Sequence, residues 1–129
     1  MSPEKILLAD SSADCRELLR HYLEILRYPT PIEANDGEEA LSKAFNERPD
    51  LIVMEIRLPK MDGFQIVARL RSNPLTRNTY ILAATAMALP EDREKCLAKG
   101  FNGYLAKPYT LKDLSDLLQT IFQATTNRA

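Results

Sequence analysis

Short apolar runs alternate with amphipathic segments along the whole chain. Four of these runs, at residues 5–9, 51–54, 80–84 and 102–106, hold mostly consecutive apolar residues, and residues 30–34 form a weaker one. Consecutive apolar residues indicate strands buried on both faces, whereas a half-exposed strand alternates apolar with polar positions. The pattern therefore predicts five short strands in a parallel sheet. Pro31 argues against a central place for the second strand.

Five amphipathic helices are predicted between and after these strands. Either Ser11 or Ser12 caps the first helix, and the Tyr28–Pro29 pair ends it. The second helix covers residues 38–47, the third follows Gly63 and ends at 72–74, the fourth covers 90–99, and the last follows Thr110. The predicted inner face of the first helix comprises Cys15, Leu18, Leu19, Tyr22, Leu23 and Leu26.

The alternation of five strands with five helices is typical of a doubly wound α/β fold, in which helices cover both faces of a parallel sheet. We expect a single domain over residues 1–125 and a frayed tail at 126–129. No internal repeat, linker or low-complexity segment divides the chain.

Charge and composition argue against several classes of function. The 129 residues carry 17 basic and 18 acidic side chains, and this balance does not indicate a nucleic-acid surface. No apolar run approaches the roughly 20 residues that cross a bilayer, and no secretory signal is visible, so we expect a cytoplasmic protein without membrane contact. Cys15 and Cys96 lie far apart on predicted helices, where we expect buried thiols in a reducing compartment.

Polar side chains follow four of the predicted strands. These residues, in chain order, are Asp10, Glu55, Thr85 and Lys107. Ligands of open α/β sheets bind beyond the carboxyl ends of the strands, where the four side chains would meet. By itself, Glu55 is either part of a polar site or a residue that ends its strand in solvent, and the set of four favours a site. A nucleotide site is disfavoured, because the turn after Asp10 contains no glycine.

The chain resembles the receiver domain of response regulators over nearly its whole length. The resemblance rests on residues 6–10, 35–41, 49–63, 83–86 and 100–108. It implies a flavodoxin-like fold of five βα units with the strand order 2-1-3-4-5. It also implies two-component signalling, in which a histidine kinase transfers a phosphoryl group to an aspartate after the third strand.

The resemblance assigns roles to positions of this sequence by motif. In receivers, two acidic residues after the first strand, the acceptor and a backbone carbonyl hold Mg²⁺, and the matching residues here are Asp10, Glu55 and Arg57, the last through its carbonyl. Thr85 and Lys107 would contact the phosphoryl group, and Tyr104 would be an aromatic switch that turns inward on activation. The Lys107–Pro108 peptide bond would be cis.

Two positions depart from the family pattern. Glu55 stands where the family has its acceptor aspartate, and Ser11 stands where it has a second acidic metal ligand. A displacement of ~1 Å in a reacting atom can cost ~10²-fold in rate, and glutamate is longer by one methylene. A serine hydroxyl brings no charge to Mg²⁺, a hard cation that needs oxygen ligands. We therefore expect weak or absent Mg²⁺ binding, no other cofactor, and a pseudo-receiver in which Glu55 partly mimics a phosphorylated residue.

The expected function is that of a stand-alone, atypical receiver in phosphorelay-type signal transduction. We expect that it is not an enzyme and that it acts by contact with a protein partner, a histidine kinase or a downstream effector. By resemblance, the contact surface covers residues 90–122, which begin at Pro90 and end at Phe122, and it also suits a homodimer. Exposure of Leu89 and Phe101 would support such a surface. His21 is expected to be a surface or boundary residue and not a relay histidine.

Three alternatives stay open. One is a structural ion pair between Glu55 and Lys107 in a site that has lost its function. A second is a receiver that still takes a phosphoryl group with Mg²⁺. A third is a flavodoxin-like domain that binds a small ligand in an apolar pocket beside Asp10 and Glu55. The sequence does not distinguish a state fixed on from a state fixed off.

Overall fold

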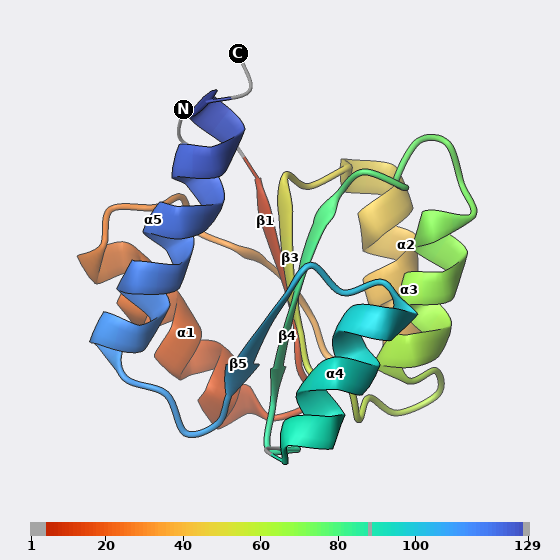
Figure 1. The fold of residues 1–129 in the computed structure, drawn as a ribbon, viewed down its shortest axis with the longest axis horizontal. Helices are drawn as coiled ribbons and strands as arrows, with labels where there is room; N and C mark the ends of the chain where they lie inside the picture. Colours follow the sequence, from red (N-terminus) through yellow and green to blue (C-terminus); the bar gives the residue numbers. More distant parts are fainter. Residues whose placement is uncertain (1–4, 88, 128–129) are drawn as a thin grey trace.

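The computed structural model describes residues 5–87 and 89–127 and contains one five-stranded sheet (Figure 1). All strand pairs are parallel, and the order is β2-β1-β3-β4-β5. The strands are β1 (Ile6–Ala9), β2 (Ile32–Ala34), β3 (Leu51–Met54), β4 (Tyr80–Thr85) and β5 (Gly103–Ala106). The helices are α1 (Ala13–Ile25), α2 (Gly37–Glu47), α3 (Gly63–Arg71), α4 (Pro90–Lys99) and α5 (Leu111–Asn127). The predicted doubly wound fold and strand order are confirmed.

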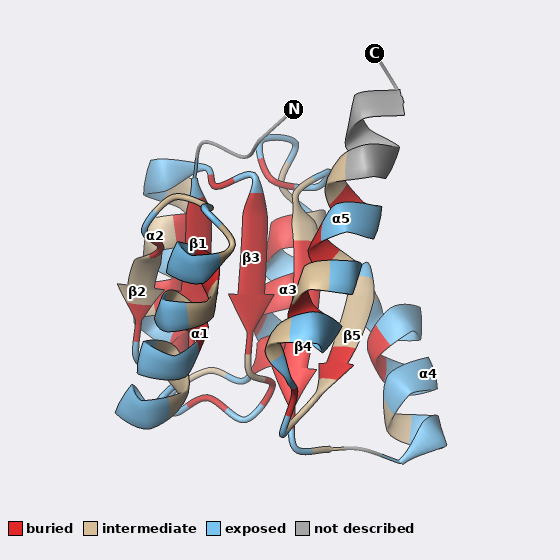
Figure 2. Ribbon diagram, turned by 90° about the vertical axis from the view of Figure 1, so that its left-hand side faces the viewer, coloured by how far each residue is buried: buried red, intermediate tan, exposed pale blue. Residues whose placement is uncertain are grey.

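The helices lie in two layers, with α1 and α5 on one face of the sheet and α2, α3 and α4 on the other (Figure 1). Each face has its own core. One joins Leu19 and Leu23 of α1 to Leu114 and Leu118 of α5, and the other includes Ile66 of α3. Figure 2 shows the central strands as buried. This burial explains why the runs that form β1 and β3 are continuously apolar.

Local signals set most helix starts. Ser12 accepts a hydrogen bond from the amide of Cys15, and Asp36 accepts one from Glu39, so each side chain caps a helix. Gly100 ends α4 with a φ of 117°, a left-handed conformation that suits glycine. The second strand is shorter than predicted and lies at the sheet edge, in keeping with Pro31 before it.

Several side chains differ from the sequence-based expectation. Leu18 is 42% exposed, because successive helix residues turn by about 100° and Leu18 points well away from its buried neighbour Leu19. Cys15 is only partly buried, whereas Cys96 is buried as expected. Phe101, whose exposure would have supported the partner surface, is 3% exposed and packs edge-on against Phe64 at a centroid distance of 6.1 Å, whereas Leu89 is exposed.

The predicted tail at 126–129 overlaps the end of α5, which continues to Asn127. Residues 128 and 129 lie outside the described residues, so the frayed tail stays a prediction. Within residues 5–87 and 89–127, no helix combines the length and apolar character needed to cross a membrane.

Arg71 stabilises the amino-terminal end of the sheet by hydrogen bonds to several segments. Its guanidinium group donates to the carbonyl oxygens of Gly100, Arg77 and Thr79 and to the side-chain oxygen of Asn102, at 2.6–3.0 Å. These contacts use all five N–H donors of the side chain. Arg71 thereby joins the end of α3 to the loop before β4 and to the turn between α4 and β5.

Candidate functional site

Four polar side chains meet at the carboxyl-terminal edge of the sheet. Asp10 follows β1, Glu55 follows β3, Thr85 ends β4 and Lys107 follows β5. Backbone hydrogen bonds continue the sheet past the strand ends, from the amide of Glu55 to the carbonyl of Ala9 and from that of Lys107 to Thr85. The extended ladder fixes the four main-chain positions relative to one another.

Lys107 bridges the two carboxylates. Its Nζ atom lies 2.6 Å from Oδ2 of Asp10 and 3.1 Å from Oε1 of Glu55. The side chains are poorly accessible, at 16% for Lys107, 7% for Asp10 and 11% for Glu55. Two carboxylates this close would repel each other in a buried place, and the ammonium group between them removes that repulsion. The Lys107–Pro108 peptide bond is cis, as the resemblance implies.

Backbone amides take the remaining carboxylate oxygens. Oδ1 of Asp10 accepts from the amide of Ser12 at 2.9 Å. Oε2 of Glu55 accepts from the amide of Ile56 at 2.6 Å and from that of Arg57 at 3.3 Å. Every oxygen of the two carboxylates therefore has a donor, which is how buried charged groups are normally satisfied.

The pairing changes the acidity of the site. Burial by itself raises the pKa of Glu55, but the hydroxyl of Thr85 and the ammonium group of Lys107 lower it by more, so the net pKa lies below its usual value. Burial lowers the pKa of Lys107, and its hydrogen bonds to Asp10 and Glu55 raise that pKa well above its usual value. Glu55 and Lys107 thus stay charged at neutral pH.

Thr85 and Tyr104 lie beside the ion bridge. Thr85 is buried, and its hydroxyl oxygen accepts from the amide of Met87 at 3.2 Å. The Tyr104 hydroxyl is buried and has no hydrogen-bond partner among the residues that the structure describes. Burial raises the pKa of Tyr104, with smaller contributions from Cys96, Asp92 and Glu55. The Tyr104 ring packs against the core that contains Met54 and Ala83.

The residues that the resemblance assigns to a metal site differ from one another in exposure and in contacts. Ser11 is exposed, and so is Arg57, whose amide rather than its side chain contacts Glu55. Mg²⁺ in proteins takes oxygen ligands, with carboxylates foremost. The two carboxylates available here both bind Lys107. Across residues 5–87 and 89–127, no group of three or more histidine, cysteine, aspartate or glutamate side chains suits a metal ion.

Sequence reasoning did not identify Arg16 or the amide donors. The guanidinium group of Arg16 donates to the carbonyl of Asp10 at 2.7 Å and to Glu33 at 3.2 Å. It connects the site to β2, the neighbouring edge strand. A basic residue on an amphipathic helix normally indicates a solvated face, so no pattern distinguishes Arg16 from its neighbours.

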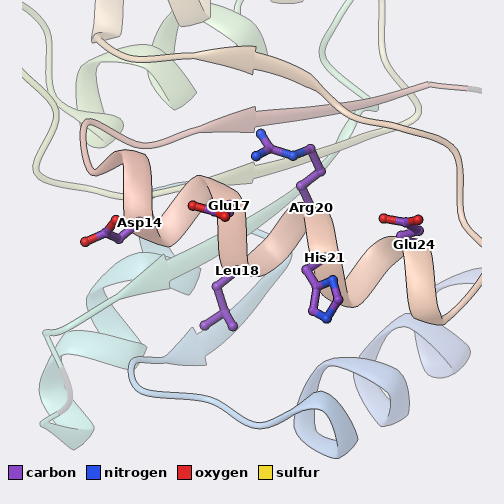
Figure 3. A pocket seen from close by; sticks show the side chains of 6 residues that line it. All are labelled: Asp14, Glu17, Leu18, Arg20, His21 and Glu24. Carbon is purple, nitrogen blue, oxygen red and sulfur yellow. The ribbon is translucent and has the colours of Figure 1, made fainter.

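An open surface hollow of about 540 Å³ lies along α1 (Figure 3). Its lining consists of Asp14, Glu17, Leu18, Arg20, His21 and Glu24. His21 is at the surface, as expected. Four of its six lining residues are charged and neither Asp10 nor Glu55 is among them, so it is not the apolar pocket that a small-ligand domain would need beside those two residues.

The chain matches the family model of the response regulator receiver domain over residues 6–119. The chain belongs to this family. Among curated proteins, the receiver domain is 40% identical over 114 residues to an uncharacterised 14.6 kDa protein of Leptolyngbya boryana, covering 88% of this chain and 86% of that protein. It is 37% identical over 120 residues to the alkaline phosphatase synthesis transcriptional regulatory protein PhoP of Bacillus subtilis, covering 93% of this chain and 49% of PhoP.

A solved structure agrees with the family assignment. The chemotaxis response regulator CheY4 of Vibrio cholerae is 34% identical, with a TM-score of 0.84, covering 94% of this receiver domain and 98% of CheY4. The chain spans about half the length of several curated regulators that it matches, including PhoP. The family match and the likeness to CheY4 agree that the chain is a response regulator receiver domain.

Proposed function

We propose that this receiver domain signals without phosphoryl transfer, with Glu55 standing permanently in the place of a phosphorylated residue. The bridge of Lys107 between Asp10 and Glu55 carries this proposal. By resemblance, Lys107 and Thr85 are the residues that would contact a phosphoryl group, and both act on the Glu55 carboxylate here. The mimicry is partial, because a carboxylate has one charge and a phosphoryl group about −1.5 to −2.

The donor set is a poor fit for Mg²⁺. Both carboxylates face an ammonium group, and Ser11 offers only a hydroxyl where the family pattern has a third carboxylate. A cation entering the site would have to displace Lys107 from two charge-assisted hydrogen bonds. With neither the metal nor an aspartate acceptor, no catalytic turnover is expected of this domain, and we assign it no cofactor.

The fixed state is the one with Tyr104 turned inward. The buried hydroxyl of Tyr104 supports this assignment, because the resemblance links an inward aromatic to the activated form. The negative charge of Glu55 is one of the causes that raise the pKa of that hydroxyl. A permanent negative charge at Glu55 would therefore hold the domain in its signalling state. The proposed fixed state is thus on and not off.

The output of the domain is contact with a protein partner, a histidine kinase or an effector, in the cytoplasm. Leu97 is an exposed residue of α4 within the proposed surface of residues 90–122, and exposed Leu89 caps the same helix directly before that surface begins. A hollow between β5 and α5, lined in part by Tyr104, Asp113 and Asp116, belongs to the same surface. Sedimentation at low and high protein concentration checks the homodimer: a mass that stays monomeric would leave only a different protein as partner.

Intact-protein mass after incubation with a small acyl phosphate and Mg²⁺ tests the proposal. The parent should gain no phosphoryl mass, whereas a variant with Glu55→Asp and Ser11→Asp should gain one phosphoryl group. The matched control carries Glu55→Asn and Ser11→Asn, which have the same size as the aspartates without their charge, and should gain none. Mass gain by the parent at Asp10 or Glu55 would overturn the proposal. If the double aspartate variant also gains nothing, Glu55 and Ser11 are not what prevents the reaction.

A further inference from the structure

The loop that follows Glu55 determines how its carboxylate lies. The β3–α3 loop covers residues 55–62 and supplies the amides of Ile56 and Arg57, which hold Oε2 of Glu55. Lys107 holds only the other oxygen. Of the contacts to Glu55, those from the loop amides move whenever the loop backbone moves.

The β3–α3 loop is folded into tight turns. The amides of Leu58 and Gly63 both donate to the carbonyl of Ile56, at 3.1 and 2.7 Å. The amide of Met61 donates to the carbonyl of Pro59 at 2.8 Å, which closes a turn around Lys60. Lys60 has a φ of 69°, a left-handed conformation that non-glycine residues rarely adopt. A turn of this kind persists only when its surroundings hold it.

Residues at the start of α2 hold the β3–α3 loop in this conformation. The amide of Gly37 donates to the same carbonyl of Pro59 at 2.9 Å. A Cβ atom at Gly37 would lie 1.8 Å from the carbonyl oxygen of Met61, so no other residue fits without displacing the loop backbone. Beside it, Oδ2 of Asp36 lies 3.4 Å from the ammonium nitrogen of Lys60. We call Asp36 and Gly37 together the α2 clamp.

We infer that the α2 clamp positions the Glu55 carboxylate, with Gly37 as the essential positioning residue. Gly37 has no described hydrogen bond to Glu55 or to Lys107, so it acts through the loop: it holds Pro59 and Met61, and they hold the amides of Ile56 and Arg57 in line with Oε2. This inference rests on the proposed role of Glu55 for its functional meaning. It makes the first turn of α2 a second place, besides the site itself, where the signalling state is set.

Two NMR observations on the full chain test this inference. The first is amide hydrogen exchange, and the second is the chemical shift of the Ile56 amide proton, which the 2.6 Å bond to a carboxylate moves downfield. In Gly37→Ala, exchange at Ile56 and Arg57 should accelerate about tenfold or more, while amides of β4 stay protected. The Ile56 proton should move upfield. Glu38→Ala, an exposed change at the next residue, is the matched control and should alter neither.

Unchanged exchange and chemical shift at Ile56 in folded Gly37→Ala would overturn the inference, since the loop would then position itself. A uniform acceleration across the sheet would also overturn it, because the role of Gly37 would be structural only.

If Gly37→Ala does not fold, Asp36→Asn decides, because asparagine keeps the helix cap and loses the charge that faces Lys60. A local rise in exchange at Ile56 supports the clamp, and no local change refutes it. These readouts need no phosphoryl transfer, so they fail or succeed separately from the mass experiment.

Discussion

The side-chain nitrogen of Lys107 lies 2.6 Å from Oδ2 of Asp10, although 97 positions separate the two residues in the chain. The same nitrogen lies 3.1 Å from Glu55. The two carboxylates follow neighbouring strands, so their charges meet at close range in a poorly hydrated place. Burial of like charges is strongly unfavourable without a cation between them. The stability of this edge of the sheet therefore depends on Lys107.

Replacement of Lys107 by methionine should destabilise the domain by about 3–5 kcal/mol, because two buried carboxylates lose their shared partner. Urea unfolding at pH 7 measures the change in the free energy of unfolding. Lys112→Met is the matched control: Lys112 also has a carboxylate partner, Asp116, at 2.7 Å, but both side chains are exposed. Exposed pairs contribute little, so the control should unfold close to the parent. Equal losses in the two variants would refute a special role for Lys107.

Acid should weaken the domain through Glu55. Burial raises the pKa of Glu55, but Thr85 and Lys107 lower it by more, and the folded-state pKa lies below the usual 4.5. The stabilisation from this depressed pKa is complete above the unfolded-state pKa and is lost as the pH falls through the folded-state pKa. Glu55→Gln should therefore be less stable than the parent at pH 7, and the difference should shrink on acidification. A difference that stays constant from pH 7 to 3 would contradict this assignment.

Alkali should have no comparable effect on the bridge. Burial lowers the pKa of Lys107, but the hydrogen bonds that its ammonium group donates to Asp10 and Glu55 raise that pKa well above the usual 10.5. The stabilisation from a raised lysine pKa is complete below the unfolded-state value and is lost only as the pH climbs through the folded-state value. The free-energy difference between the parent and Lys107→Met should thus be flat from pH 7 to about 10. A decline over that range in urea unfolding would be the contrary result.

Removal of the Tyr104 hydroxyl should stabilise the domain. A buried hydroxyl without a partner costs about 1–3 kcal/mol, so Tyr104→Phe should raise the free energy of unfolding by about 1 kcal/mol. Tyr80→Phe offers a contrast in sign, since the Tyr80 hydroxyl donates to the carbonyl of Asn102 at 3.3 Å and its loss should be neutral or mildly destabilising. Thermal unfolding of both variants measures the difference. A destabilised Tyr104→Phe would mean that this hydroxyl is satisfied in solution.

The fold could be predicted because burial on both faces leaves a plain pattern in the sequence. Leu51–Met54 is apolar at every position because helices cover both sides of β3, and the doubly wound layers follow from that. Convergence of Asp10 and Glu55 at one edge also follows, since parallel strands end together. Topology alone thus accounts for the location of the candidate site.

The contacts within the site could not be predicted in the same way. That Lys107 reaches both carboxylates depends on side-chain rotamers and on a loop path that no periodicity encodes. The amides that hold Glu55 belong to backbone turns whose shape depends on Gly37, a residue from another element. Leu18 was wrongly assigned to the inner face of α1, because helical spacing limits which face a residue is on but not how far its neighbours cover it.

The contacts of Arg71 at the amino-terminal end of the sheet differ chemically from the ion bridge at the carboxyl-terminal end. The five hydrogen bonds of Arg71 go to neutral oxygens, and a guanidinium group remains protonated throughout the ordinary pH range. Protons do not compete for the Arg71 hydrogen bonds at the amino-terminal end of the sheet, whereas the contact of Lys107 with Glu55 at the carboxyl-terminal end requires an ionised carboxylate. A falling pH should therefore weaken the contact between Glu55 and Lys107 before it affects the Arg71 hydrogen bonds, so that one end of α3 loses a neighbouring contact while the other end keeps its own.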